Sequence, residues 1–221
     1  MIRLDKLGKA FANGDSNFWA VRNVSLSVAA GEVLGLSGPS GSGKSTLLSM
    51  LGGLMRPDEG SISVAGTDLG TMAATKVDHF RAGRIGIIFQ RFNLIPVLSA
   101  QENVEMALIP SGIGSASRKA RAAEWLERVG LAHRSHVRAA LLSGGEQQRV
   151  AIARALVHAP SIVLADEPTA NLDRKNATIF LDSLIELNKL SGTTLVIATH
   201  DPLVLSYMAR VVTMEDGQCL T

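Results

Sequence analysis

Residues 38–46 read Gly38-Pro39-Ser40-Gly41-Ser42-Gly43-Lys44-Ser45-Thr46. This stretch fits the pattern G-x-x-x-x-G-K-[ST] of a phosphate-binding loop. Glycines allow backbone N–H groups to turn inward and approach phosphate oxygens closely, where a Cβ atom would intrude. In such a loop Lys44 reaches the β- and γ-phosphates of a nucleotide, and the Ser45 hydroxyl ligates Mg²⁺. We therefore predict that the whole stretch binds a nucleoside triphosphate.

The residues on either side of the loop agree with this prediction. Residues 33–37 form an apolar run that predicts a buried strand, and residues 46–51 predict the start of a helix. A helix that begins after Gly43 directs the positive end of its dipole at the same anion. The alternative is a glycine-rich turn without a ligand, and the strand and helix around the loop count against it.

Composition narrows the class of protein. The 221 residues suit one large domain or two small ones, and 46 % of them are hydrophobic, which allows a sizeable core. The net charge of +2 is small, and no Lys/Arg block suggests an arm that binds nucleic acid. Cys219 is the single cysteine, so an internal disulfide is excluded and a reducing compartment is expected.

The sequence also bears on membrane insertion. The N-terminus carries charges where a signal peptide needs an apolar region. No apolar run approaches the roughly 20 residues of a membrane span. We expect any action at a membrane to occur through another chain.

Short alternating and apolar runs predict strands in both halves of the chain. Residues 24–28 alternate between polar and apolar types, which is typical of a half-buried antiparallel strand, and residues 61–65 alternate again. Residues 162–165 form an unbroken apolar run, the mark of a central parallel strand. Further features are a hairpin loop at 12–17 and strands at 2–4, 84–89, 194–199 and 210–214, the last of these being the final strand.

Helical patterns dominate residues 91–155, where strand signals are absent. Within residues 118–129 apolar side chains recur at i, i+3, i+4 and i+7 from Ala122, and Gly130 follows as a C-terminal cap. Another helix is expected from about residue 174 to 190. We predict an α/β fold with a helical insert, in one domain over residues 1–221.

Polar residues come directly after several of the predicted buried strands. Gln90, Asp166, Glu167 and His200 all occupy such positions, and open α/β sheets bind their ligands at the carboxyl ends of their strands. Asp166 is suited to hold Mg²⁺. Glu167 is placed to orient or deprotonate an attacking water. An isolated Asp-Glu pair would more simply cap a loop, but the phosphate-binding loop favours the catalytic interpretation.

A second motif reads Leu142-Ser143-Gly144-Gly145-Glu146-Gln147-Gln148-Arg149. Ser143 with Glu146 three residues later is a capping box for a helix that runs to about residue 158. A cap alone explains neither the two glycines nor the two glutamines. The glycines leave the helix N-terminus bare, so its N–H groups can meet a phosphate directly.

These motifs together resemble the ATP-binding subunit of ABC transporters. They span nearly the whole chain in the expected order: a Walker A loop at 38–45, a Q-loop at Gln90, a signature at 142–147, a Walker B strand at 162–167, a D-loop at 170–173 and a switch histidine at His200. The signature is the most specific, because many NTPases share the phosphate loop. Residues 89–96 and 101–104 resemble the lipoprotein-release and macrolide-export branch of the family.

The resemblance implies a more detailed architecture. The fold would be a P-loop NTPase of the RecA-like type, with a mostly parallel sheet, an N-terminal antiparallel β subdomain and an inserted α-helical subdomain. The core would comprise about residues 1–90 and 156–221, and the helical subdomain about residues 91–155.

The resemblance further implies an ATPase with ATP and Mg²⁺ as cofactors. Two copies would face head to tail, with ATP between the phosphate loop of one copy and the signature of the other. Ser143 and Gly145 would contact the γ-phosphate, and Gly144 and Glu146 would line the same site.

Other residues receive roles from the same resemblance. Gln90 would contact Mg²⁺ and sense a membrane partner, and His200 would hydrogen-bond the γ-phosphate. Asp173 would reach across the dimer. Gln90 and His200, with Lys44 and Glu167, form the expected catalytic set.

Two aromatic residues are candidates for stacking on adenine. Phe11 matches the family position, where tyrosine is more frequent, and Trp19 is its rival. Each is otherwise an ordinary packing residue. Residues 136–141 lack the proline often found before the signature, which bears on local loop geometry and not on the chemistry.

The expected function is an ATPase that drives a separate membrane-spanning permease subunit from the cytoplasmic face of the membrane, for export or for extraction of a substrate. One alternative is a soluble ABC-type ATPase that acts on nucleic acid or ribosomes, although the chain lacks a long coiled-coil insertion and a strong basic patch. Another is a regulatory partner that binds ATP without turnover, which intact Glu167 and His200 oppose.

Overall fold

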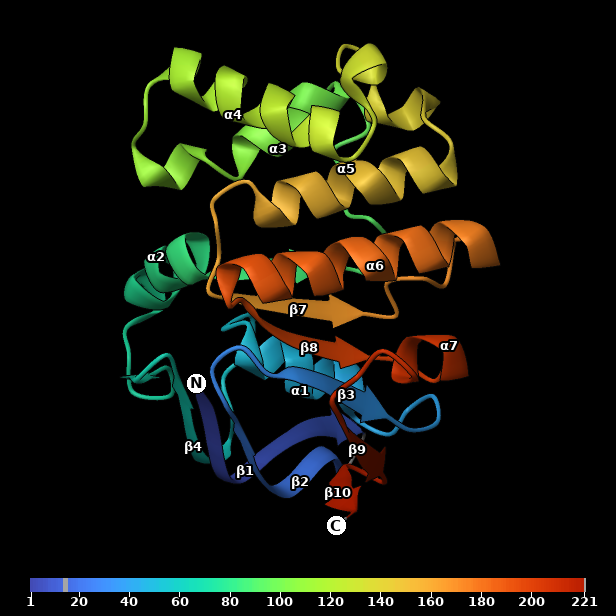
Figure 1. Ribbon diagram of the computed structural model, residues 1–221. Helices are drawn as coiled ribbons and strands as arrows, with labels where there is room; N and C mark the ends of the chain where they lie inside the picture. Colours follow the sequence, from blue (N-terminus) through green and yellow to red (C-terminus); the bar gives the residue numbers. More distant parts are fainter. Residues whose placement is uncertain (14–15, 221) are drawn as a thin grey trace.

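The strand that leads into the phosphate loop lies inside a six-stranded sheet of order β10-β9-β3-β8-β7-β6. A computed structural model describes residues 1–13 and 16–220 (Figure 1). The strands β9, β3, β8, β7 and β6 pair in parallel, and β10 pairs antiparallel with β9. Their bounds are β3 Val33–Ser37, β6 Ile85–Ile88, β7 Ile162–Asp166, β8 Thr194–Ala198, β9 Arg210–Glu215 and β10 Gln218–Leu220.

The strands β3, β7 and β8 are buried on both faces of the sheet, which explains their unbroken apolar runs. Along β7 and β8 successive side chains point to opposite faces. Val163 and Ile197 pack with the helix α6 (Arg174–Ser191), while Leu164 and Val196 pack in the cluster that contains α1 (Lys44–Leu51). The strands are therefore fixed from both sides, and their carboxyl ends are held in register.

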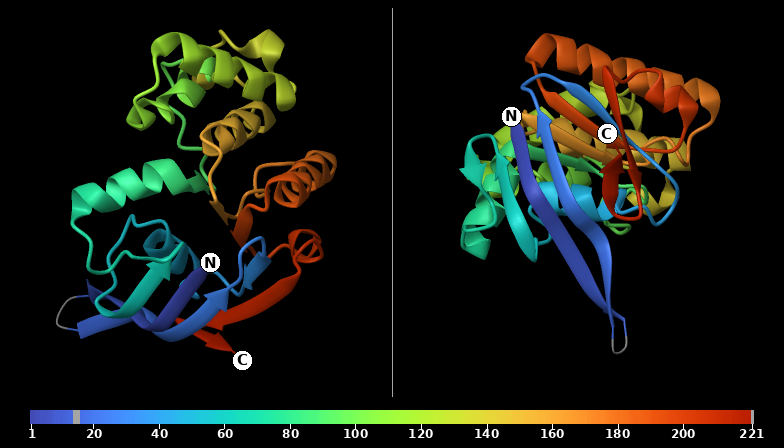
Figure 2. Two further views of the ribbon diagram at one scale, coloured as in Figure 1. Left: turned by 60° about the vertical axis from the view of Figure 1, so that its left-hand side comes forward. Right: turned by 90° about the horizontal axis from the view of Figure 1, so that it is seen from below.

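The N-terminal part forms a second, antiparallel sheet of order β2-β1-β4-β5. Its core side chains, such as Leu7, Val21 and Ile62, join the cluster around α1. The strands are β1 Ile2–Asn13, β2 Ser16–Val28, β4 Glu59–Val64 and β5 Thr67–Asp68. The β1–β2 pair extends away from the six-stranded sheet (Figure 2).

Residues between β6 and β7 form a helical group that lies beyond α6 in Figure 1. This group has its own buried cluster, in which Val104, Leu126 and Val150 are fully buried. Its helices are α3 Ala100–Met106, α4 Ser115–Arg128 and α5 Gly144–Leu156, with short 3₁₀ turns η1 Ile109–Ser111, η2 Ala132–Arg134 and η3 Ala139–Leu141. Two further helices, α2 Ala74–Arg84 and α7 Pro202–Leu205, flank the parallel sheet. Among the described residues, no helix has the length and apolar character needed to cross a bilayer.

Most elements expected from the sequence are confirmed. The structure contains the strands expected at residues 33–37, 162–165 and 194–199 and the helix expected from residue 174. Residues 91–155 are mainly helical, as predicted. The α/β fold with a mostly parallel sheet and an N-terminal antiparallel sheet is confirmed as well.

Four expectations need correction. The strand predicted at residues 24–28 is the last part of β2, which begins at Ser16. The first strand is far longer than residues 2–4, because β-bulges after Leu4 interrupt the alternation by which a strand is recognised. The strand at residues 210–214 is not the last one, since β10 comes after it. The expected hairpin loop at 12–17 is shorter, because Asn13 pairs with Ser16; residues 14 and 15 lie outside the described residues.

The core of the helical group can be tested by substitution. Leu126→Ala removes a fully buried side chain, and we expect a loss of about 2–5 kcal/mol in the free energy of unfolding. Leu190→Ala on α6 is the control, because this leucine is 80 % exposed, and its effect should stay within about 0.5 kcal/mol. Urea denaturation followed by circular dichroism measures both, and equal losses would contradict the burial of Leu126.

Candidate functional site

The phosphate loop connects β3 to α1 and depends on glycine at three positions. Gly38, Gly41 and Gly43 have φ values of 144°, 84° and 97°, a region that side chains disfavour. A Cβ on Gly43 would lie 2.2 Å from the carbonyl oxygen of Ala20, and one on Gly38 would lie 2.2 Å from that of Met214. A Cβ on Gly41 would meet no atom within 4 Å. The loop is thus packed against β2 and β9 at its ends and open at its centre.

Lys44 lies inside this loop. Its side chain is buried, and its ammonium Nζ donates to the carbonyl oxygens of Gly38 and Pro39, both at 2.8 Å, and to Ser42 Oγ at 3.3 Å. The ammonium has three donors, and its hydrogen-bond partners among the described residues are all neutral oxygens. A buried cation that faces an open backbone loop suits an anionic ligand better than it suits the carbonyls alone.

Asp166 ends β7 beside the start of α1. Burial raises the pKa of its carboxyl group, and the neighbouring charge of Glu167 raises it further. A hydrogen bond from Ser45 and the charge of Lys44 act in the opposite direction. A half-buried carboxylate next to a hydroxyl is a donor set that suits Mg²⁺, so these two side chains fit the metal predicted from the sequence.

Glu167 comes next and adopts a left-handed backbone with φ of 42°. Its N–H donates to the carbonyl oxygen of Ala198 at 2.9 Å, which fixes it against the end of β8. The carboxylate is bound by two consecutive residues: Oε1 lies 2.6 Å from Nδ1 of His200, and Oε2 accepts from the Thr199 hydroxyl at 3.0 Å. The Glu167 side chain is mostly buried, whereas His200 is largely exposed.

The signature motif begins α5, and its capping box is confirmed. Ser143 Oγ accepts from the N–H of Glu146 at 3.3 Å, and the Glu146 carboxylate accepts from the N–H of Ser143 at 2.8 Å. That backbone hydrogen bond, with Arg134 nearby, holds the pKa of Glu146 below its usual value. Glu146 is therefore engaged by its own helix, while Ser143 and Gly144 are exposed.

Gln90 and Asp173 lie in neighbouring loops. Gln90 is exposed just after β6, and its carbonyl oxygen accepts from Asn171 Nδ2 at 2.8 Å. Asp173 caps α6 by accepting from the N–H of Asn176 at 2.8 Å, and this bond lowers the pKa of its carboxyl group. The Gln90 and Asp173 loops are thus joined through the segment that contains Asn171.

Two residues that the sequence analysis did not select also shape this region. Arg154 of α5 donates to the carbonyl oxygens of Phe92, at 2.7 Å, and Asn93, so it anchors the segment after Gln90 to the signature helix. Phe18 lies directly opposite Phe11 in the β1–β2 pair. Antiparallel pairing of the two halves of the hairpin would have indicated Phe18, whereas no local pattern indicates the contact of Arg154.

The two rival aromatic residues differ in their surroundings. Phe11 is 40 % exposed and Phe18 56 % exposed, and paired residues of adjacent strands project from the same face. Trp19 is adjacent to Phe18 and so projects from the other face, where its ring lies close to Gly8. Phe11 is the more available ring.

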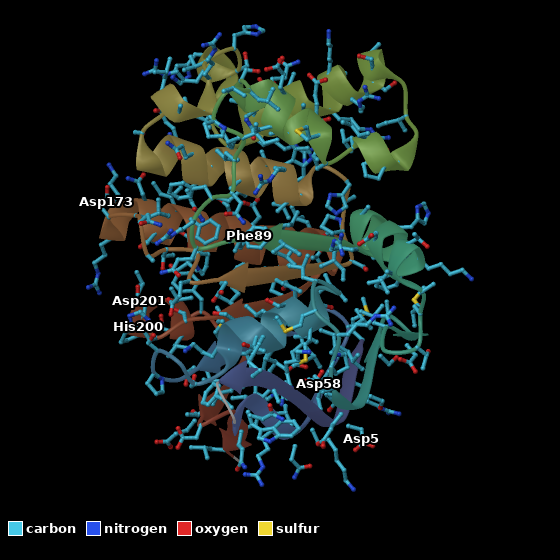
Figure 3. The ribbon with its side chains drawn as sticks, turned by 180° about the vertical axis from the view of Figure 1, so that it is seen from behind. Asp5, Asp58, Phe89, Asp173, His200 and Asp201 are labelled. Carbon is cyan, nitrogen blue, oxygen red and sulfur yellow. The ribbon has the colours of Figure 1, made fainter. Side chains whose placement is uncertain are left out.

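The structure thus brings most of the predicted site residues to one edge of the parallel sheet. The phosphate loop, Asp166, Glu167 and His200 lie at the ends of strands β3, β7 and β8 there, and Asp173 and His200 lie along the same side of the molecule (Figure 3). Ser143 belongs to the helical group, at the start of α5, and α5 packs directly against the edge strand β6 of the sheet. A glycine-rich loop between a strand and a helix, with a carboxylate at the end of a nearby parallel strand, defines the P-loop NTPase class.

Comparison with known proteins narrows this class. The chain belongs to the ABC transporter family, whose sequence model matches residues 21–170. It is 44 % identical over 216 residues to the lipoprotein-releasing system ATP-binding protein LolD of Paramagnetospirillum magneticum, covering 98 % of this chain and 96 % of that protein. It is 43 % identical over 218 residues to the macrolide export ATP-binding/permease protein MacB of Burkholderia cenocepacia, covering 99 % of this chain. The chain spans only 32 % of that relative's length.

A solved structure also places the chain among ABC ATP-binding cassettes. The ATP-binding cassette MJ0796, in a dimeric post-hydrolysis state bound to ADP and Pi, matches with a TM-score of 0.96 and 38 % identity. The match covers 100 % of this chain and 97 % of that one. The chain therefore has the fold of an ABC ATP-binding cassette.

The loop geometry leads to a stability prediction. Gly43→Ala places a Cβ against a backbone oxygen at positive φ, and we expect it to cost about 3 kcal/mol or more in the free energy of unfolding. Gly41→Ala meets open space and should cost only about 1–2 kcal/mol. Thermal unfolding without nucleotide compares the two variants, and equal losses would show that the loop is not packed against β2.

Proposed function

We propose that the chain is the ATP-hydrolysing subunit of a transporter and that it drives a separate membrane-spanning subunit. The observation that carries the proposal is the carboxylate of Glu167, held by His200 at the same sheet edge as the phosphate loop. Phosphoryl transfer requires mainly positioning and charge stabilisation, and this edge supplies both.

The phosphate loop would hold the nucleotide. The open centre at Gly41 leaves room for phosphate oxygens beside backbone N–H groups. Lys44 would exchange its carbonyl partners for the β- and γ-phosphates, which are stronger acceptors for an ammonium. The first N–H groups of α1 point at the same position. The remaining loop residues contribute backbone or side-chain donors: Gly38, Pro39, Ser40, Ser42, Gly43, Ser45 and Thr46.

A magnesium ion would be held by Ser45 and Asp166, with Gln90 as a further oxygen donor. The ion would neutralise charge on the β- and γ-phosphates. Burial penalises the ionised carboxyl group of Asp166, and a cation would offset that penalty. Gln90 is exposed and free of the capping contacts that engage the nearby Asp173.

Glu167 would act as the general base. Its carboxylate accepts from Thr199 and lies against His200, so its orientation is fixed before substrate arrives. Orienting the attacking water is the step that an NTPase needs from such a residue. His200, whose side chain is exposed, would reach the γ-phosphate with its other ring nitrogen.

The second half of the site would come from another copy of the chain. The exposed N-terminus of α5, with Ser143, Gly144 and Gly145, has bare N–H groups that suit a γ-phosphate. The MJ0796 cassette, which is similar over the whole chain, is dimeric. Glu146 would support this surface through its cap, and Asp173 would face the partner copy from the start of α6.

The adenine ring would stack on Phe11, with Phe18 beside it on the same face of the hairpin. A pair of exposed aromatic rings offers a larger apolar surface than one ring. The ring of Trp19 is directed to the other face and packs near Gly8, so Trp19 is not proposed as the stacking residue.

A membrane-spanning partner would dock beside Gln90. A groove of about 590 Å³ lies there, and its lining includes Phe89, Asn93 and Ala107. Figure 3 shows Phe89 at the end of β6 on this face. Arg154 links the groove to α5, so a partner in the groove could act on the signature.

We further propose a division of the chain into a RecA-like core, about residues 1–90 and 156–221, and a helical subdomain of about residues 91–155, each with its own buried cluster. The chain would act on the cytoplasmic face of a membrane. The relatives named for lipoprotein release and macrolide export favour export or extraction from the membrane. They give no support to the alternative of an ATPase that acts on nucleic acid or ribosomes.

The proposed base can be tested directly. Glu167→Gln keeps the hydrogen-bonding shape of the side chain but removes its basicity, so we expect the ATPase rate to fall by about 100-fold or more. ATP should then trap a dimer that persists on size-exclusion chromatography. Glu127→Gln on exposed α4 is the matched control and should leave the rate unchanged. Wild-type turnover by Glu167→Gln would exclude Glu167 as the base.

A further inference from the structure

We infer that Thr199 is a positioning residue that sets the carboxylate of Glu167 relative to the phosphate loop. The inference rests on the proposed role of Glu167 as general base. The buried Thr199 hydroxyl would not touch the nucleotide, but it would affect the rate of hydrolysis.

The direction of the hydrogen bonds at Thr199 is fixed by its neighbours. The side chain is fully buried just after β8, and its Oγ1 accepts from the N–H of Asp201 at 3.0 Å. A hydroxyl has one proton, and Glu167 Oε2 lies 3.0 Å from the same oxygen. An ionised carboxylate can only accept, so the Thr199 proton is directed at Glu167.

The position of Asp201 is itself constrained. Asp201 is the N-cap of α7, and its Oδ1 accepts from the N–H of Leu203 at 2.9 Å. Its own N–H therefore cannot move far from Thr199 without loss of the cap. The N–H of Asp201 therefore occupies the Thr199 hydroxyl as an acceptor, and the hydroxyl proton remains available to Glu167.

The backbone of Thr199 connects this bond to the phosphate loop. The N–H of Thr199 donates to the carbonyl oxygen of Leu36 at 2.9 Å, and Leu36 belongs to β3, which leads into the loop. The N–H of Glu167 donates to Ala198, the residue before Thr199, at 2.9 Å. Two routes of hydrogen bonds thus join β3 to Glu167 through the end of β8.

Thr199 and His200 hold the two carboxylate oxygens in different ways. The His200 side chain is 75 % exposed and would be engaged by the γ-phosphate, so its contact with Glu167 can change during turnover. Thr199 is buried and tied to β3. The threonine is therefore the permanent support of the carboxylate, and the histidine is the adjustable one.

The test separates the hydroxyl from the bulk of the side chain. Thr199→Val keeps the shape and removes the hydroxyl, and we expect kcat of the full chain with Mg²⁺ and ATP to fall about 10- to 100-fold. KM for ATP should stay within about twofold, because the lost contact does not bind the nucleotide. Thr199→Ser keeps the hydroxyl and should retain kcat within about threefold.

A matched control lies at the other end of the same strand. Thr194 is also fully buried, and its hydroxyl accepts from the N–H of Gly31 at 3.0 Å, away from Glu167. Thr194→Val should keep kcat within about twofold even where its Tm falls. Thr199→Ala is a second hydroxyl-free variant if Thr199→Val does not fold.

The outcomes test the role of Thr199 separately from the proposed ATPase function. If Glu167→Gln is inactive while Thr199→Val and Thr199→Ala keep the wild-type kcat, the positioning role is wrong and the function stands. If Thr199→Ser is as slow as Thr199→Val, the hydroxyl is not the cause and the inference is overturned. If Glu167→Gln turns over at the wild-type rate, the proposed function itself fails.

Discussion

The parallel pairing of β3, β8 and β7 is the constraint on which the site depends. In this register Leu36 lies opposite Ala198, and Ala198 lies opposite Asp166. The three strands therefore end side by side, and the segments that leave them are gathered at one edge. Those segments are the phosphate loop, the Asp166-Glu167 pair and the Thr199-His200 pair. Apolar burial of both sheet faces maintains this register, because a slip by one residue would expose alternate side chains.

The same arrangement leaves the site incomplete within one chain. The signature motif lies at the start of α5 in the helical group, where the capping box of Ser143 and Glu146 engages the N–H groups of those two residues and does not include those of Gly144 and Gly145. Bare helix N-termini are suited to phosphate. A second copy that presents this surface to the phosphate loop would complete the site. Arg154, on the same helix, connects the signature to the segment after Gln90 and so to the groove proposed for a membrane partner.

Local patterns in the sequence were sufficient for elements with an unbroken apolar run or a clear terminating residue. The strand β3 has the predicted bounds, and α6 ends at Gly192, which adopts φ of 67° as a C-terminal cap. The helix α2 was not predicted, because Val77 is its one buried residue and no apolar periodicity results. The length of β1 was missed because bulges break its alternation. Some site residues could be predicted from the sequence and others could not. The phosphate loop is identified by the fixed spacing of its residues. The contact of Thr199 with Glu167 and the choice of Phe11 over Trp19 depend on strand pairings that only the folded chain contains.

The central claim is that each nucleotide site takes its phosphate loop from one copy and its signature from another. Two inactive variants, Lys44→Ala and Gly145→Asp, test it when mixed, because only a mixed dimer contains one undamaged loop opposite one undamaged signature. An equal mixture is expected to recover about a quarter of the wild-type ATPase rate per chain, because half of the dimers are mixed and each mixed dimer has one intact site. A mixture no more active than the two variants measured separately would contradict the claim.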